Sequence, residues 1–176
     1  MIFSPAEISG MYIITLEPRE DDRGSFARMF CQHELAKANI EFTPVQINQA
    51  VTKNKGAMRG LHLQTAPKEE AKVFQCLEGS IFDVVADIRP DSPTFGKWLG
   101  TQLDADVPKI LYIPKGVAHG YQTLKDNCRV QYLVSEFYSP ETEKGVRWND
   151  PFFNISWPLP PVSVSEKDSR FPDFKK

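Results

Sequence analysis

The sequence has little cysteine, no excess of positive charge and no long apolar run. Its three cysteines, Cys31, Cys76 and Cys128, are scattered and odd in number, which argues against a disulfide framework and fits a reducing compartment. The formal net charge is −2, so we expect no nucleic-acid partner. No apolar run approaches the ~18 residues of a membrane span, and no signal-peptide pattern is visible at the N-terminus. These absences predict a cytoplasmic protein that does not associate with a membrane.

The size and composition are typical of one folded unit. The chain has 176 residues, of which 41% are hydrophobic and 25% charged, and this balance excludes a disordered or fibrous protein. Proline and glycine are spread along the chain rather than pooled in a linker. We therefore expect residues 1–176 to form a single domain.

The apolar segments are short, rich in β-branched and aromatic residues, and bounded by turn residues. The clearest ones span residues 73–77, 81–88, 110–113 and 130–138. Many short strands at close spacing predict an all-β sandwich or barrel. Residues 77–81 (LEGSI) predict a tight hairpin. The segment QHELAKA, residues 32–38, predicts one short peripheral helix, and the proline-rich stretch from Trp148 predicts an irregular wrap that ends near Asp168.

Two polar clusters interrupt these strands. In the first, MRGLHLQ at residues 58–64, His62 and Gln64 would share one face of a strand, and Arg59 would share it only if Gly60 kinks the chain. In the second, residues 113–120, a tight turn at Gly116 comes just before His119. Taken alone, His62 is better interpreted as a half-buried histidine bonded to a backbone carbonyl than as a functional group.

Together the two clusters resemble the two halves of the cupin pattern, which implies a jelly roll with one or two short helices at its periphery. Metal-binding cupins carry two histidines and a glutamate in the first half, and those positions here include Gln64 and Lys72. Because a lysine ammonium has no lone pair for a metal ion, only His62 and His119 remain as good ligands. Two ligands are too few for a zinc or iron site, so we expect no metal and disfavour a metal-dependent oxygenase.

Lys72 allows two interpretations. A buried ammonium is costly unless a negative group meets it, and a developing enolate oxygen would be such a group. Alternatively, the long side chain extends out of the mouth of the barrel and keeps its charge in water.

Eight stretches, in this order, make a more specific resemblance. They are D-R-G-S-F at 22–26, R-G-L-H-x-Q at 59–64, A-K-V at 71–73, F-D-V-V-A-D-I-R at 82–89, S-P-T-F-G-x-W at 92–98, I-P-x-G-x-A-H-G at 113–120, W-N-D-P at 148–151 and S-x-K-D at 165–168. The chain resembles the dTDP-4-dehydrorhamnose 3,5-epimerase family. The resemblance implies a homodimer, with the N-terminal strand region at the interface. It also implies a nucleotide-sugar substrate and an epimerisation next to a 4-keto group with no cofactor or metal.

The same resemblance implies roles for four residues: His62 is the general base, Asp168 orients it, Lys72 lies near the enolate oxygen and Tyr132 is the acid on the opposite face. Histidine suits a base for a carbon acid, because its pKa is near neutral. A carboxylate on the other ring nitrogen fixes the tautomer. Without the resemblance, Asp168 would be interpreted as a helix cap or a solvated residue of the tail.

Further residues match positions of the family that contact the substrate. Those that hold the pyrophosphate or sugar are Arg23, Arg59 and His119. The aromatic positions near the base and sugar are Phe26 and Tyr138. The polar positions lining the site are Gln46 and Asn48.

The chain departs from the family pattern in the segments that contact the nucleotide. Arg28 stands where a glutamate is usual, and Ile47 where an aspartate is usual. The resemblance implies inversion at C3 and C5 of a dTDP-linked sugar, and the departures make a CDP- or GDP-linked sugar an alternative. Two further alternatives are an epimerase acting at C3 or C5 only and a non-catalytic sugar-binding cupin.

Overall fold

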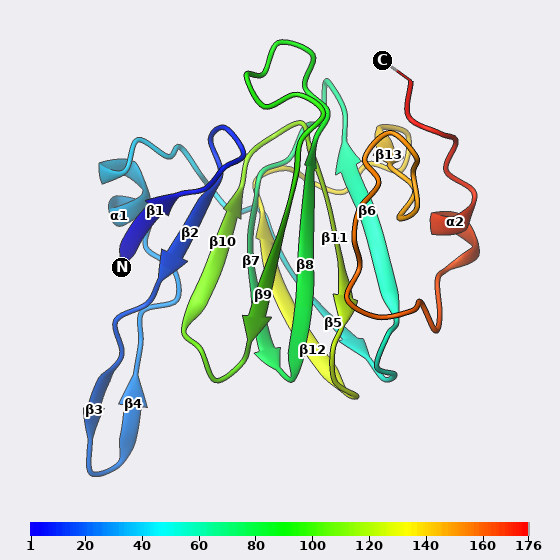
Figure 1. Cartoon of the computed structure of the whole chain (residues 1–176). Coiled ribbons are helices and arrows are strands. Elements are labelled where there is room, and N and C mark those ends of the chain that lie inside the picture. The colour runs from blue at the N-terminus through cyan, green and yellow to red at the C-terminus, as the bar shows by residue number, and fades with distance from the viewer. Residues whose placement is uncertain (176) are drawn as a thin grey trace.

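Two antiparallel sheets face each other in the computed structural model, which describes residues 1–175 (Figure 1). The six-stranded sheet has the order β1 (Ile2–Pro5), β2 (Tyr12–Thr15), β10 (Lys109–Ile113), β7 (Lys72–Glu78), β12 (Cys128–Val134) and β5 (Gln46–Thr52). The five-stranded sheet has the order β13 (Glu143–Gly145), β6 (Met58–Gln64), β11 (Val117–Thr123), β8 (Ser80–Asp87) and β9 (Trp98–Asp104). The predicted all-β jelly roll is confirmed.

The main core lies between the sheets and follows from the alternation of side chains along each strand. Phe74 and Leu111 of the six-stranded sheet pack in one buried cluster with Val85 and Tyr121 of the five-stranded sheet. This core fills one part of the space between the sheets and leaves the remaining part as a cavity.

The outer faces of both sheets are also covered. Helix α1 (Gln32–Lys37), at the predicted position, buries Leu35 against the six-stranded sheet. Val146 covers the five-stranded sheet together with Phe153 and Ile155, which belong to the predicted irregular wrap. That wrap ends in a second short helix, α2 (Glu166–Ser169), beside β6 (Figure 1). Among residues 1–175, no helix is long and apolar enough to cross a membrane.

The hairpin predicted at residues 77–81 is wrong. Strand β7 pairs with β10 and β12, whereas β8 pairs with β11 and β9, so the two strands belong to different sheets. Gly79, at φ 82°, turns the chain from one sheet to the other. The turn residues were identified correctly, but a local turn signal does not determine which strands pair.

The last apolar segment is shorter as a strand than residues 130–138 predict, because β12 ends at Val134. Beyond it, side chains take the backbone hydrogen bonds that a strand would use. Gln64 donates to Phe137 O (3.1 Å) and accepts from the amide of Ser139 (2.6 Å). The amide of Tyr138 donates to the side chain of Gln46 (2.7 Å).

A two-stranded hairpin, β3 (Arg19–Asp21) and β4 (Gly24–Phe26), projects away from both sheets (Figure 1). Every residue of its two strands is exposed. It carries Arg23 and Phe26, two of the predicted substrate-binding residues.

Asp87, fully buried at the end of β8, ties together the loop that follows. Its carboxylate accepts hydrogen bonds from Arg89 Nη2 (2.7 Å), Ser92 Oγ (2.5 Å) and Thr94 Oγ1 (2.6 Å). Burial acts to raise the pKa of Asp87, but these hydrogen bonds outweigh it and lower the pKa to about 2. The D-I-R and S-P-T motifs therefore build one structural loop rather than the site.

This carboxylate gives a prediction about stability and pH. Because the pKa of Asp87 falls on folding, its ionisation stabilises the fold above the unfolded value of about 3.9, by about 2 kcal/mol, and this contribution is lost as pH falls toward 2. Replacing Asp87 by Asn should lower the free energy of unfolding at pH 7 by about 2–4 kcal/mol. Denaturant unfolding at several pH values should show this difference shrinking between pH 4 and pH 2. Asp91→Asn, in the exposed part of the same loop, is the matched control; a difference for Asp87→Asn that stayed constant with pH would contradict the prediction.

Candidate active site

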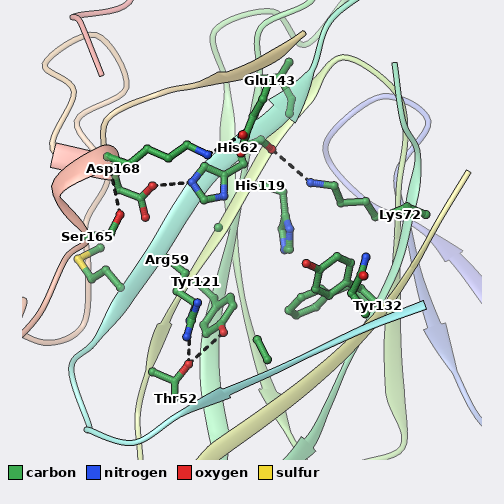
Figure 2. Close-up of a pocket in the computed structure, with 18 of the residues that line it drawn as sticks. Thr52, Arg59, His62, Lys72, His119, Tyr121, Tyr132, Glu143, Ser165 and Asp168 are labelled. Atoms are coloured by element: carbon green, nitrogen blue, oxygen red, sulfur yellow. Dashed lines mark hydrogen bonds and ion pairs between the residues drawn. The ribbon is translucent and has the colours of Figure 1, made fainter. Parts of the chain in front are cut away.

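A cavity of about 760 Å³ lies between the two sheets. Except for Arg23 and Phe26, all the predicted site residues line it, and Figure 2 labels several of them. The predicted residues that line it are Gln46, Asn48, Arg59, His62, Lys72, His119, Tyr132, Tyr138 and Asp168. The structure thus brings together residues that are spread over more than half of the sequence.

His62 and Asp168 form a close pair at one wall of the cavity. His62 Nε2 lies 2.6 Å from Asp168 Oδ1, and the Asp168 side chain is only 4% exposed, whereas His62 is 32% exposed. Asp168 also accepts from the amide of Gly60 (3.1 Å). Burial acts to raise the pKa of Asp168, but the hydrogen bond and the charge of His62, with the Gly60 amide, outweigh it and keep the pKa below its usual value. The carboxylate therefore stays ionised and accepts from Nε2–H, which leaves Nδ1 of His62 free to take a proton.

Helix α2 places Asp168, and the helix cap is a different residue. The amide of Asp168 donates to Ser165 Oγ at 3.0 Å, so Ser165 caps α2. Asp168 is neither the cap nor solvated, and the interpretation that the sequence alone favoured is wrong. Phe171, just beyond the helix, packs edge-on against the His62 ring with centroids 5.9 Å apart.

Gly60 brings Arg59 and His62 to the same cavity. His62 pairs with His119 and Arg59 with Tyr121, so three steps along β6 match two steps along β11, which defines a β-bulge. Gly60 has φ 104°, and a Cβ there would lie 2.6 Å from His119 O. Only glycine fits this position, and the kink that the sequence analysis required for Arg59 is present.

Lys72 points into the cavity and is only 8% exposed, so of the two interpretations the buried ammonium is correct. Its Nζ lies 3.1 Å from Glu70 Oε1 and donates to His62 O at 3.4 Å. Glu70 also lines the cavity and is a residue that the sequence analysis missed. Because its neighbours Lys68 and Glu69 are also charged, the segment resembles a solvated loop, and the sequence alone does not assign Glu70 to the site.

Tyr132 lies on β12, in the sheet opposite to the one that carries His62 (Figure 2). Its ring stacks on Phe74 with centroids 5.9 Å apart and an interplanar angle of 26°. Burial raises the pKa of Tyr132, and the charge of Glu70 adds to the rise. The phenol is therefore protonated at neutral pH and can act as an acid.

His119 is buried and held by its own carboxylate. Its Nε2 lies 2.7 Å from Asp83 Oδ2, and its ring packs edge-on against Phe74 with centroids 4.5 Å apart. Asp83 is a further residue that the sequence analysis did not assign, although it lies in the matched F-D-V-V-A-D-I-R stretch.

Gln64, at a metal-ligand position of the cupin pattern, uses its amide to tie loops together and donates to Lys68 O at 2.8 Å. Within residues 1–175, no group of three or more His, Cys, Asp or Glu side chains is arranged to hold a metal ion.

Polar side chains complete the rim of the cavity. Arg59 Nε donates to Thr52 Oγ1 (3.0 Å), and the hydroxyl of Tyr138 donates to Glu143 Oε2 (2.7 Å). Lys167 Nζ lies 2.5 Å from the same Glu143 oxygen. Burial acts to raise the pKa of Glu143, but the hydrogen bonds from Lys167 and Tyr138 lower it, so this carboxylate is ionised. Glu143 and Lys167 were not predicted, although Lys167 lies inside the S-x-K-D motif.

Arg23 and Phe26 do not reach the cavity of their own chain. They lie on the projecting β3–β4 hairpin, where the Arg23 side chain is 90% exposed and pairs with Asp21. Phe26 is 70% exposed. The structure therefore separates these two residues from the other predicted binding residues.

Comparison with known proteins decides the family. The family model described as dTDP-4-dehydrorhamnose 3,5-epimerase matches residues 5–176. The chain belongs to the dTDP-4-dehydrorhamnose 3,5-epimerase family. The predicted family, jelly-roll fold and assignment as an enzyme are confirmed.

Relatives from this epimerase family match nearly the whole chain. The dTDP-4-dehydrorhamnose 3,5-epimerase of Escherichia coli (strain K12) is 41% identical over 163 residues, which cover 90% of this chain and 87% of the relative. The crystal structure of the Bacillus anthracis epimerase with TDP and PPi bound superposes with a TM-score of 0.95 at 36% identity, covering 98% of this chain and 99% of that one. A dTDP-4-dehydrorhamnose 3-epimerase of Streptomyces niveus is 37% identical over 169 residues, which cover 96% of this chain and 81% of the relative.

Proposed function

We propose that this epimerase inverts C3 and C5 of dTDP-4-dehydro-6-deoxyglucose and so forms dTDP-4-dehydrorhamnose. The observation that carries the proposal is the cavity, in which His62, paired with Asp168 of α2, lies on one sheet and the protonated Tyr132 lies on the other. The family and the relatives that share this fold support the same reaction. The substrate is a nucleotide sugar, and TDP in the Bacillus anthracis structure favours dTDP over CDP or GDP.

The chemistry uses the acidity of the two carbons beside the C4 ketone. Nδ1 of His62 takes the proton from C3 or C5, and the electron pair moves into the carbonyl to form an enolate. Lys72 donates a hydrogen bond to the enolate oxygen, and Asp168 stabilises the imidazolium that has formed. Tyr132 then returns a proton to the other face of the same carbon. Solvent takes the proton from His62 and restores the proton of Tyr132 before the second carbon reacts. In this proposal protein side chains carry out both proton transfers at carbon, without a cofactor or metal.

Solvent exchange tests the proposal directly. The chain is incubated with dTDP-4-dehydro-6-deoxyglucose in heavy water, and NMR measures deuterium at C3 and C5. We expect label and inversion at both carbons. No label at either carbon, with CDP- and GDP-linked substrates equally inert, would leave a non-catalytic sugar-binding cupin.

An epimerase that acts at one carbon is the second candidate. The 37% identical relative from Streptomyces niveus, named as a 3-epimerase, shows that such proteins lie within the range of similarity of this chain. In the same experiment, label at C3 alone or at C5 alone would identify this activity.

We further propose that the protein is a homodimer in which the hairpin of one subunit completes the site of the other. The exposed Arg23 and Phe26 support this, because a guanidinium and an aromatic ring suit a nucleoside diphosphate and neither reaches its own cavity. Ile47 lies on the edge strand β5 and is 64% exposed, so it offers apolar surface for the contact between the two subunits.

Sedimentation velocity at micromolar concentration should therefore give the mass of a dimer, about 40 kDa from a 20.0 kDa chain. Arg23→Ala should raise KM for the nucleotide sugar by about tenfold and leave kcat nearly unchanged, because one charged phosphate contact is lost. Arg19→Ala, at the other end of the same hairpin, is the control. A monomer of full activity would contradict the shared site.

A further inference from the structure

Glu70 lines the cavity together with Lys72, the proposed hydrogen-bond donor to the enolate, and Tyr132, the proposed acid. Neither the family pattern as matched here nor the proposed function gives Glu70 a role. Its side chain is 12% exposed and that of Lys72 is 10% exposed, with 3.1 Å between Oε1 and Nζ. Both line the cavity together with Tyr132. A carboxylate buried this deeply is costly unless it is paired, and its pairing with Lys72 offsets that cost.

The backbone around Glu70 is held in place. The next residue, Ala71, is fixed from both sides by Ser135: the Ala71 amide donates to Ser135 Oγ (2.8 Å), and the Ser135 amide donates to Ala71 O (3.1 Å). Ala71 itself is buried. Glu70 therefore enters the cavity from a fixed point at the start of β7 rather than from a loose loop.

Lys72 has few other partners. Its ammonium has three N–H groups, and apart from Glu70 its bond within the described chain is the long one of 3.4 Å to His62 O. Two N–H groups directed to these partners leave the third for the cavity, where the enolate oxygen would form. Without Glu70, the flexible lysine side chain would be held by one weak hydrogen bond alone.

The charges around Tyr132 come from several elements. Glu70 and Glu143 raise the pKa of Tyr132 in addition to burial, and Arg59 lowers it. The other titratable side chains that line the cavity from β6, β7 and β11 are His62, Lys72, His119 and Tyr121. Of the charged groups that act on Tyr132, Glu70 has the largest effect.

We propose that Glu70 is a positioning residue of the epimerase, whose carboxylate fixes the Lys72 ammonium toward the enolate oxygen and places a negative charge near the Tyr132 phenol. This inference rests on the proposed function for its catalytic consequence. It names a residue that acts through Lys72 and Tyr132 and does not itself exchange protons with the sugar.

Two substitutions separate the two effects. Glu70→Gln keeps an oxygen that accepts from Lys72 but removes the charge, whereas Glu70→Ala removes both. We expect kcat to fall about threefold for Gln and on the order of tenfold or more for Ala, with KM changed less than about twofold, because the loss falls on the transition state. Glu69→Gln is the matched control, since Glu69 lies next in the chain and lines a different, outer cavity.

A measurement without substrate tests the charge effect. Tyrosinate absorbance is titrated in the parent and in Glu70→Gln, and the same titrations in the Tyr132→Phe background are subtracted to isolate Tyr132. We expect the pKa of Tyr132 to be lower in Glu70→Gln than in the parent and unchanged in Glu69→Gln. Because this titration needs no turnover, it remains decisive if the parent proves inactive on the dTDP-linked sugar and the proposed function fails.

Several results would overturn the inference. They are a kcat for Glu70→Ala within twofold of the parent, an equal loss in Glu69→Gln, or an unchanged Tyr132 titration in Glu70→Gln. If Glu70→Ala does not fold, as judged by its circular dichroism and melting temperature, the folded Glu70→Gln variant decides the question through its kcat and its titration.

Discussion

A His62→Ala variant is expected to lose deuterium exchange at both C3 and C5. His62 lines the cavity, and while its Nε2 is held 2.6 Å from the buried Asp168, its Nδ1 is free to take a proton. Removing a general base costs about 10²–10⁴-fold in rate, which takes exchange close to the detection limit. NMR of the sugar after incubation in heavy water measures the loss, with the parent run alongside.

The control for this prediction is His33→Ala. His33 lies exposed on α1, outside the cavity, so its removal tests whether loss of any histidine matters. His33→Ala should keep the exchange rate of the parent. Exchange at either carbon that survived in His62→Ala at the parent rate would show that another group is the base, and His119 would then be the nearest candidate because it pairs with His62 across β6 and β11.

The strand residues of the site could be predicted from the sequence because local pattern determines them. Turn residues mark the ends of β6, β11 and β12, and alternation then places His62, His119 and Tyr132 on definite faces. Arg59 is an exception to this alternation, because it shares the cavity with His62 only through the β-bulge at Gly60. The glycine in the sequence indicated that such a kink was possible. Thus, a period of two and one glycine predict which side chains of these strands share a face, and the resemblance to the family assigned that face to the site.

Asp168 and Glu70 could not be predicted from local sequence. Asp168 is 106 residues from His62, in a tail with no periodicity, and only the resemblance to the family identified it. Glu70 follows two charged residues and looks solvated, yet the two hydrogen bonds between Ala71 and Ser135 place it at the cavity. The pairing of strands could not be predicted either. The turn residues around Gly79 are the same whether the turn joins two paired strands or connects strands of different sheets.

A Tyr132→Phe variant is expected to keep proton exchange and lose net inversion. His62 and Asp168 remain, so the base still removes the proton and can return it, now partly as deuterium, to the face from which it came. The opposite face loses its acid, because the ring of phenylalanine fills the place beside Phe74 but carries no hydroxyl. We expect inversion to fall on the order of 10²-fold or more, while exchange stays within about tenfold of the parent.

The stereochemistry of the labelled sugar distinguishes this outcome from a general loss of activity. In Tyr132→Phe, deuterium should be found at carbons that keep their original configuration, whereas the parent should place it at inverted carbons. Tyr112→Phe is the matched control, since Tyr112 is also a tyrosine of the six-stranded sheet but is buried in the core on the outer face of that sheet. Inverted, labelled product from Tyr132→Phe at the parent rate would mean that the second proton comes from another group in the cavity, and the assignment of acid and base to facing sheets would be lost with it.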